Sequence, residues 1–125
     1  MHVIIDGRSK NKELLEQEHL LKAWLIKTAK QIGMTIYGEP VVVDYPWPGS
    51  YYTALSAICF LGESSILVHT YPEYSFVFID VFSCKDFDCD MLEGNICRDF
   101  KIVNLHVFQL QRGVKDGKII PATRR

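Results

Sequence analysis

The sequence predicts an α+β fold, a two-layer sandwich in which an antiparallel sheet carries two helices on one face. Three apolar segments, 51–61, 65–71 and 74–84, follow one another through short connections, and such connections force antiparallel neighbours. Apolar residues recur at helical spacing over about 11–32, and a second, short helix is expected over 88–100. Elements in this order are typical of a sheet with both helices on one side.

The remaining segments complete the predicted element order. Residues 2–6 form a predicted strand, and 34–44 and 101–110 form two more. The stretch 44–50 is a predicted loop, because its prolines and glycine prevent regular strand pairing. The order β-α-β-β-β-β-α-β contains no repeat or linker, which indicates a single domain over 1–125.

Composition narrows the class of protein. The 125 residues include 14 Lys and Arg against 15 Asp and Glu, so the basic excess of a general nucleic-acid binder is missing. No apolar run is long enough to span a membrane, and the first residues do not resemble a signal peptide. The cysteines have no CxxC spacing, which favours reduced thiols. We therefore expect a cytoplasmic protein with no metal site and no nucleic-acid or membrane partner.

The segment 62–84 carries chemistry-bearing residues at defined spacings. An acidic residue and a serine precede an apolar strand, a histidine lies within that strand, and a cysteine ends the next one. These residues are Glu63, Ser64, His69, Pro72, Glu73, Asp80 and Cys84. In these residues and their spacing the sequence resembles the small prokaryotic S-adenosylmethionine decarboxylases, which make their own pyruvoyl cofactor.

The resemblance implies a pyruvoyl-dependent S-adenosylmethionine decarboxylase of polyamine (spermidine) biosynthesis. Decarboxylation of an amino acid leaves a carbanion, so the enzyme needs a carbonyl that combines with the substrate amine and takes up the electrons. By the resemblance, the chain cleaves itself between Glu63 and Ser64 into 1–63 (the β chain) and 64–125 (the α chain). Ser64 then becomes a covalent pyruvoyl group, and the processed protomers form a homodimer.

The resemblance also implies roles for individual side chains. His69 would be the base that removes Hα of Ser64, and Ser56 would help to activate the scissile carbonyl. Cys84 would be the acid that protonates the product carbon after CO2 leaves, a role suited to a thiol near neutral pH. Residues expected to contact the substrate are Tyr71, Glu73 and Trp47.

Each of these residues also has an ordinary structural interpretation. Ser64 is compatible with a simple turn, His69 with a hydrogen-bonded core histidine, and Cys84 with a small buried side chain. The aromatic residues are compatible with simple packing. Two functional alternatives stay open as well: the same chemistry on arginine or ornithine, and a homologue that neither cleaves nor catalyses.

Two residues beside the reaction centre depart from the bacterial pattern. Ser65 stands where a histidine is usual, and Lys85 stands where a glycine usually follows the cysteine. A cation next to Cys84 stabilises its thiolate and makes it a poorer proton donor, unless the lysine points away. Substrate identity is therefore less firmly predicted than pyruvoyl chemistry.

Strand geometry sets a further condition on the site. A hairpin that turns through Gly62–Ser65 would place Ser56 opposite Tyr71, roughly 20 Å along the strand from Ser64. Either the strands are offset or bulged, or the active site combines residues from two subunits. The paired-subunit architecture implied by the resemblance favours the second arrangement.

Overall fold

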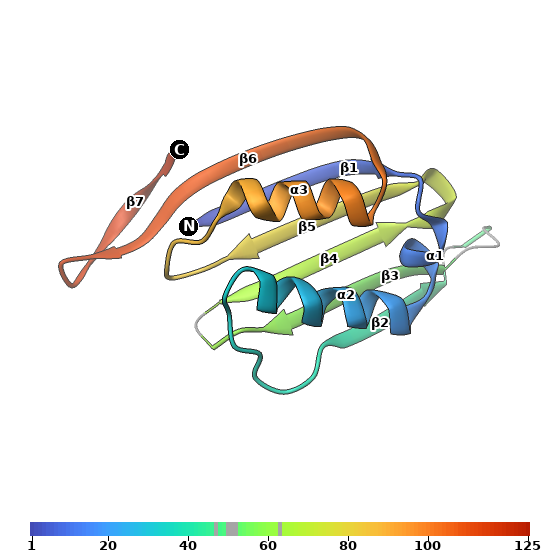
Figure 1. Ribbon diagram of the computed structural model, residues 1–125, viewed down its shortest axis with the longest axis horizontal. Helices are drawn as coiled ribbons and strands as arrows, with labels where there is room; N and C mark the ends of the chain where they lie inside the picture. Colours follow the sequence, from blue (N-terminus) through green and yellow to red (C-terminus); the bar gives the residue numbers. More distant parts are fainter. Residues whose placement is uncertain (47, 50–52, 63) are drawn as a thin grey trace.

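Seven antiparallel strands make one sheet in the part of the chain that the computed structural model describes, residues 1–46, 48–49, 53–62 and 64–125. The strand order is β2-β3-β4-β5-β1-β6-β7 (Figure 1). The strands are β1 (His2–Ser9), β2 (Val41–Pro46), β3 (Thr53–Phe60), β4 (Ser65–Tyr71), β5 (Phe76–Phe82), β6 (Ile102–Lys115) and β7 (Lys118–Arg124). The helices of the same ranges are α1 (Lys12–Glu16), α2 (Glu18–Gln31), α3 (Cys89–Asp99) and the short 3₁₀ helix η1 (Pro72–Tyr74).

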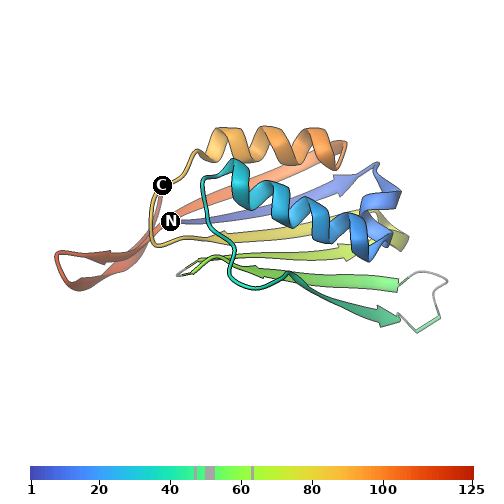
Figure 2. The same cartoon turned by 60° about the horizontal axis from the view of Figure 1, so that its bottom comes forward.

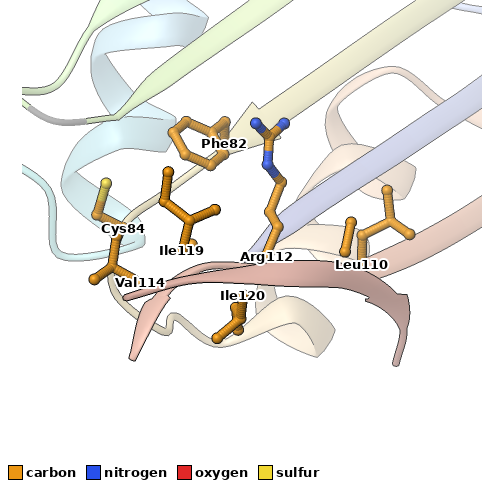
Figure 3. A pocket seen from close by; sticks show the side chains of 9 residues that line it. Phe82, Cys84, Leu110, Arg112, Val114, Ile119 and Ile120 are labelled. Atoms are coloured by element: carbon orange, nitrogen blue, oxygen red, sulfur yellow. The ribbon is translucent and has the colours of Figure 1, made fainter. Parts of the chain in front are cut away.

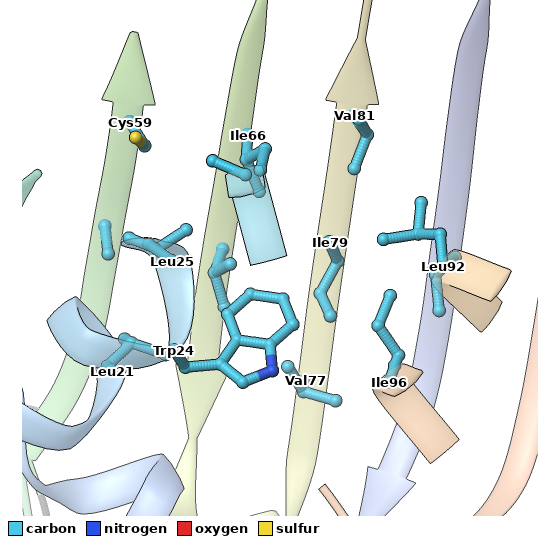
Figure 4. Packing of buried hydrophobic residues seen from close by; sticks show 14 of the residues in the cluster. Leu21, Trp24, Leu25, Cys59, Ile66, Val77, Ile79, Val81, Leu92 and Ile96 are labelled. Atoms are coloured by element: carbon cyan, nitrogen blue, oxygen red, sulfur yellow. The ribbon is translucent and has the colours of Figure 1, made fainter. Parts of the chain in front are cut away.

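The hydrophobic core lies between the sheet and the helices. In Figures 1 and 2, α2 and α3 lie next to one another over the same side of the sheet. Figure 4 shows α2 and α3 directing apolar side chains onto buried residues of β3, β4 and β5. Trp24 on α2 also donates from Nε1 to Asp99 Oδ2 at 3.1 Å, which ties α2 to the end of α3.

The α+β class and the antiparallel sheet predicted from the sequence are confirmed, but the helical content differs from the prediction. The helix expected over 11–32 is divided into α1 and α2 because Gln17 has an extended backbone, with φ −107° and ψ 116°. The described residues therefore hold three α-helices instead of two.

The strand content differs from the prediction at both edges of the sheet. The strand expected over 34–44 begins only at Val41, since Gly38 with φ +75° and the following Glu39-Pro40 interrupt regular pairing. The last strand runs on to Lys115, and β7 returns antiparallel to it. This β6–β7 hairpin projects beyond the other strands (Figures 1 and 2).

The register of the β3–β4 hairpin differs from the simple hairpin considered above. Ser56 lies opposite His69, and Phe60 lies opposite Ser65. Leu61 N–H donates to the Ser64 carbonyl at 2.8 Å, so Leu61 and Ser64 face one another at the end of the hairpin. Gly62 has φ +66°, a left-handed conformation that glycine adopts without steric cost. The centre of the observed turn lies one residue nearer the N-terminus than in the simple hairpin. Each residue of β3 therefore faces a residue of β4 two positions earlier in the chain.

The two faces of the sheet have different surroundings. Along β4, Ile66, Val68 and Thr70 are buried on the helix side, while the residues between them are half-buried on the other side. This second face, which we call the open face, carries many large apolar side chains. They include Ile4, Ile58, Leu67, Phe76, Phe78, Phe82 and Phe108.

Candidate active site

Ser64 lies at the end of the β3–β4 turn, next to the start of β4. It is buried, and its Oγ donates a hydrogen bond to Ser83 Oγ at 3.2 Å. The register of β4 and β5 explains this contact, because Ser65 pairs with Phe82 and the next residues outward are Ser64 and Ser83. The hydroxyl of Ser64 is therefore held on the helix side of the sheet, out of water.

Cys84 follows Ser83 directly and is exposed at the same end of the sheet. Its side chain lines a pocket of about 610 Å³ together with Phe82, Arg112 and apolar residues of the β6–β7 hairpin (Figure 3). Exposure of the thiol overturns its interpretation as a small buried side chain. Cys84 and Ser64 thus lie on the same corner of the molecule.

Lys85, the unusual neighbour of Cys84, is directed to another partner. Its Nζ donates to the Gly33 carbonyl at 3.4 Å, in the turn that follows α2. The lysine ammonium is therefore directed to the C-terminal end of α2, where carbonyl groups favour cations.

Ser56 and His69 form a second group on the open face. They lie directly opposite one another on β3 and β4, and Ser56 Oγ is 2.8 Å from His69 Nδ1. Both side chains are half-buried. A hydroxyl that bonds Nδ1 helps to fix the orientation of the imidazole.

Within one chain the two groups are far apart. Five residues of extended chain separate Ser64 from His69, a distance of roughly 16 Å. The two residues also differ in parity along β4, so the Ser64 hydroxyl faces the helices while His69 lies on the open face. His69 of one chain therefore cannot reach Ser64 of the same chain. Of the two arrangements considered from the sequence, an offset of the strands within one chain does not bring Ser64 and His69 together.

The expected substrate-binding residues lie elsewhere. Tyr71 ends β4 at the far end from Ser64 and packs edge-on against Phe78, with ring centroids 5.6 Å apart. Glu73 is exposed in η1. Trp47 and the cleavage-site residue Glu63 lie outside the described residues. One chain therefore does not gather Tyr71 and Glu73 around Cys84.

Three residues at this end of the sheet carry interactions that the sequence did not reveal. His2 Nε2 lies 3.1 Å from Asp80 Oδ1, and Arg112 Nη1 lies 3.4 Å from His2 Nδ1. The guanidinium of Arg112 also stacks on Phe82, 4.5 Å from the ring centroid. Asp80 is thus a hydrogen-bonded, half-buried strand residue.

The remaining cysteines have no features of reactive thiols. Burial raises the pKa of the Cys59, Cys89 and Cys97 thiols, so they remain protonated near neutral pH. Among the described residues, no group of three or more His, Cys, Asp or Glu side chains is arranged to hold a metal ion. No helix in the same ranges is both long enough and apolar enough to cross a bilayer.

Comparison with known protein families shows which family the chain belongs to. The model of the family described as S-adenosylmethionine decarboxylase matches residues 1–113, which include both groups. The chain belongs to this family. The resemblance found in the sequence is confirmed, and the enzyme class of the family is a carboxy-lyase.

Individual relatives agree with the family match. The chain is 26% identical to the S-adenosylmethionine decarboxylase proenzyme of Thermotoga petrophila over 121 residues, which cover 96% of this chain and 88% of the relative. It is 28% identical to S-adenosylmethionine decarboxylase proenzyme 2 of Bacillus cereus, over 97% of this chain and 93% of the relative. The fold is similar to the crystal structure of the adenosylmethionine decarboxylase from Aquifex aeolicus, with a TM-score of 0.70 and 16% identity, covering 96% of this chain and 95% of that one.

Proposed function

We propose that this chain decarboxylates S-adenosylmethionine with a pyruvoyl group that it makes from its own Ser64. The observation that carries the proposal is the corner that holds Ser64 and Cys84 together, in a chain that belongs to the S-adenosylmethionine decarboxylase family. The relatives named above are proenzymes, which supports processing of this chain too. The product would enter polyamine (spermidine) biosynthesis, as the family implies.

Self-cleavage at this corner needs only the chain and water. Ser64 Oγ attacks the Glu63 carbonyl carbon, the peptide C–N bond breaks, and the hydroxyl proton moves to the nitrogen, which gives an ester. Removal of Ser64 Hα then breaks the Cβ–Oγ bond and releases the Glu63 carboxylate. Water then hydrolyses the remaining dehydroalanine, which releases its nitrogen as ammonia and leaves a pyruvoyl group at the N-terminus of the α chain. The fragments are 1–63 and 64–125.

The surroundings of Ser64 fit a pyruvoyl group. Ser64 follows Gly62 in the β3–β4 turn and contacts Ser83, the residue before Cys84, so a carbonyl formed from it would lie close to the residue that lines the pocket. When present, that carbonyl supplies the electron sink that decarboxylation requires. The chain contributes the acid: the Cys84 thiol is exposed to the pocket and suited to give a proton to the product carbon.

We further propose that the complete site is made by two copies of the chain. In one copy His69 is roughly 16 Å from Ser64 and on the other side of the sheet, too far for proton transfer. The open face carries Ser56 and His69 among large half-buried apolar residues, a surface that favours burial against a partner. A symmetric homodimer packed through this face would bring Ser56 and His69 of one copy toward the Cys84 pocket of the other, at the end of the sheet where Ser64 lies.

The same dimer accounts for the expected substrate contacts. Tyr71 and Glu73 lie at the far end of β4 from Ser64 of their own chain, which supports a contribution to the site of the second copy. Trp47 is proposed to contact the substrate as well. Reduced thiols throughout the chain support a cytoplasmic enzyme.

Mass spectrometry and denaturing electrophoresis of the purified protein test the proposal. We expect the fragments 1–63 and 64–125, with the α chain lighter by one ammonia than a fragment that begins with serine. Incubation with S-adenosylmethionine should release CO2, whereas arginine and ornithine should not. Cleavage of a Ser64→Ala variant, or CO2 release from arginine in preference to S-adenosylmethionine, would contradict the assignment.

A further inference from the structure

A second buried hydroxyl lies against the hydroxyl of Ser64. Ser64 Oγ donates to Ser83 Oγ at 3.2 Å, and Ser83 is completely shielded from solvent, with 0% of its surface exposed. The proposed mechanism gives Ser83 no role. A buried polar side chain in contact with the attacking atom of a reaction is well situated to control the direction of that atom.

Ser83 is itself fixed on several sides. Its Oγ accepts a second hydrogen bond from the Lys85 N–H at 3.1 Å and directs its own proton to Met34 Sδ at 3.9 Å. Its backbone is paired with Met1: the N–H donates to the Met1 carbonyl at 2.9 Å, and the carbonyl accepts from the Met1 amine at 2.6 Å. The acceptor for Ser64 is therefore already oriented before any reaction begins.

The contact restricts the Ser64 side chain. A serine side chain has three staggered rotamers, and only some direct the hydroxyl toward the preceding carbonyl carbon. Burial keeps water from offering Ser64 an alternative partner, so the bond to Ser83 selects one rotamer. Ser83 cannot be the base, because its own proton is directed to a thioether, which is a weak acceptor.

We propose that Ser83 is a positioning residue for self-cleavage, holding the Ser64 hydroxyl in the rotamer from which the acyl shift starts. The inference rests on the proposed function. In the shift, a bond forms between Ser64 Oγ and the Glu63 carbonyl carbon, and the bond from that carbon to the Ser64 nitrogen breaks. The proton of the hydroxyl ends on that nitrogen, so no further reactant takes part. Ser83 acts before the ester exists, and His69 acts after it.

The first test compares two buried serines. Ser9 is 1% exposed, and its Oγ accepts from the N–H of Asn11, two residues later, at 3.1 Å, as Ser83 Oγ accepts from Lys85. Ser9 donates to the Phe100 carbonyl and lies at the far end of β1 from Met1, so it has no contact with Ser64. Ser83→Ala should slow cleavage on the order of tenfold, the factor that one aligned hydrogen bond provides. Ser9→Ala should cleave at the wild-type rate.

Two further substitutions keep the test decisive if Ser83→Ala does not fold. Ser83→Thr retains the hydroxyl and should restore cleavage to within about threefold of wild type. Ser83→Cys retains the shape but offers a weaker acceptor, and it should cleave as slowly as Ser83→Ala. If Ser83 only stabilised the fold, the cleavage rates of the variants would instead follow their melting temperatures.

Hydroxylamine, which cleaves esters, identifies the step that is affected. His69→Ala should stop after the ester has formed, so hydroxylamine should release its fragments. Ser83→Ala should hold no ester, so hydroxylamine should release nothing from it.

The outcomes separate this inference from the proposed function. If wild type cleaves and Ser83→Ala matches Ser9→Ala in rate, or if Ser83→Ala accumulates ester, the role of Ser83 is overturned and the proposed function stands. If wild type stays whole under the same conditions, or Ser64→Ala cleaves, the proposed function fails, and the role of Ser83 fails with it.

Discussion

Mixing two inactive variants tests whether the active site is shared between copies. Ser64→Ala removes the nucleophile, and His69→Ala removes the proposed base. Within one chain these two residues are roughly 16 Å apart along β4 and on opposite sides of the sheet, so neither can serve the other. Each variant alone should therefore remain uncleaved and inactive.

The expected activity of the mixture follows from the geometry of a two-fold dimer. When both variants are co-expressed in equal amounts, half of the dimers are mixed. One of the two sites in each mixed dimer has a native Ser64 from one copy and a native His69 from the other. The mixture should therefore reach about one quarter of wild-type CO2 release. Different affinity tags allow isolation of the mixed dimer, in which only the His69→Ala chain should be cleaved.

Two results would refute the shared site. The first is a co-expressed mixture as inactive as its components, although purification with both tags shows that mixed dimers have formed. The second is normal self-cleavage of a dilute monomer, because a monomer offers Ser64 only its own, distant His69. Sedimentation at the assay concentration establishes which species is present.

Three further substitutions test the account at single residues. Cys84→Ala should still cleave but lose about 10²–10⁴-fold of its decarboxylation rate, measured as CO2 release; wild-type turnover would exclude Cys84 as the acid. Lys85→Gly should leave the pH profile of decarboxylation unchanged, because Lys85 Nζ is directed to Gly33; a shifted profile would contradict this. Gly62→Ala should destabilise the chain by about 1–2 kcal/mol in denaturant melts and slow cleavage. Its control, Gly38→Ala, has a similar positive φ but no atom within 4 Å of its added Cβ, whereas the Cβ added at Gly62 lies 3.2 Å from Tyr37 Cε2; Gly38→Ala should therefore lose less stability and cleave normally.

Local patterns in the sequence predicted most of the central sheet. The segment 65–71 forms a strand over the predicted bounds, and the helix expected over 88–100 appears as Cys89–Asp99. In β4 buried and half-buried residues alternate strongly because one face of the sheet packs on helices. Burial therefore sets the pattern. The break at Gln17 was not predicted, because a single residue in extended conformation leaves the apolar repeat almost undisturbed.

Features that depend on pairing between segments were harder to predict. The register of the β3–β4 hairpin depends on which two residues occupy the turn, and an error of one residue moved the expected partner of Ser56 from His69 to Tyr71. The strand β7 was missed because its residues are mostly exposed and carry no strong alternation. This strand forms by pairing with β6, and its own short sequence does not show that pairing.

The candidate site was predicted as a set of residues, but its arrangement was not. The family resemblance identified Ser64, His69 and Cys84, and the structure places Ser64 against Ser83, the residue before Cys84, and Ser56 against His69. The structure also places the Ser64 hydroxyl and His69 on different sides of the sheet. The contact between Ser64 and Ser83 depends on the pairing of β4 with β5, which no local pattern specifies.

Intact-mass measurement of freshly purified wild-type protein beside Ser64→Ala tests the central claim most directly. The account predicts that wild type separates into 1–63 and 64–125, with the second fragment one ammonia lighter than a chain that begins with serine. Ser64→Ala should keep the mass of the full chain of 125 residues. A wild-type protein that stays whole while it releases CO2 from S-adenosylmethionine would contradict the claim that Ser64 supplies the catalytic carbonyl.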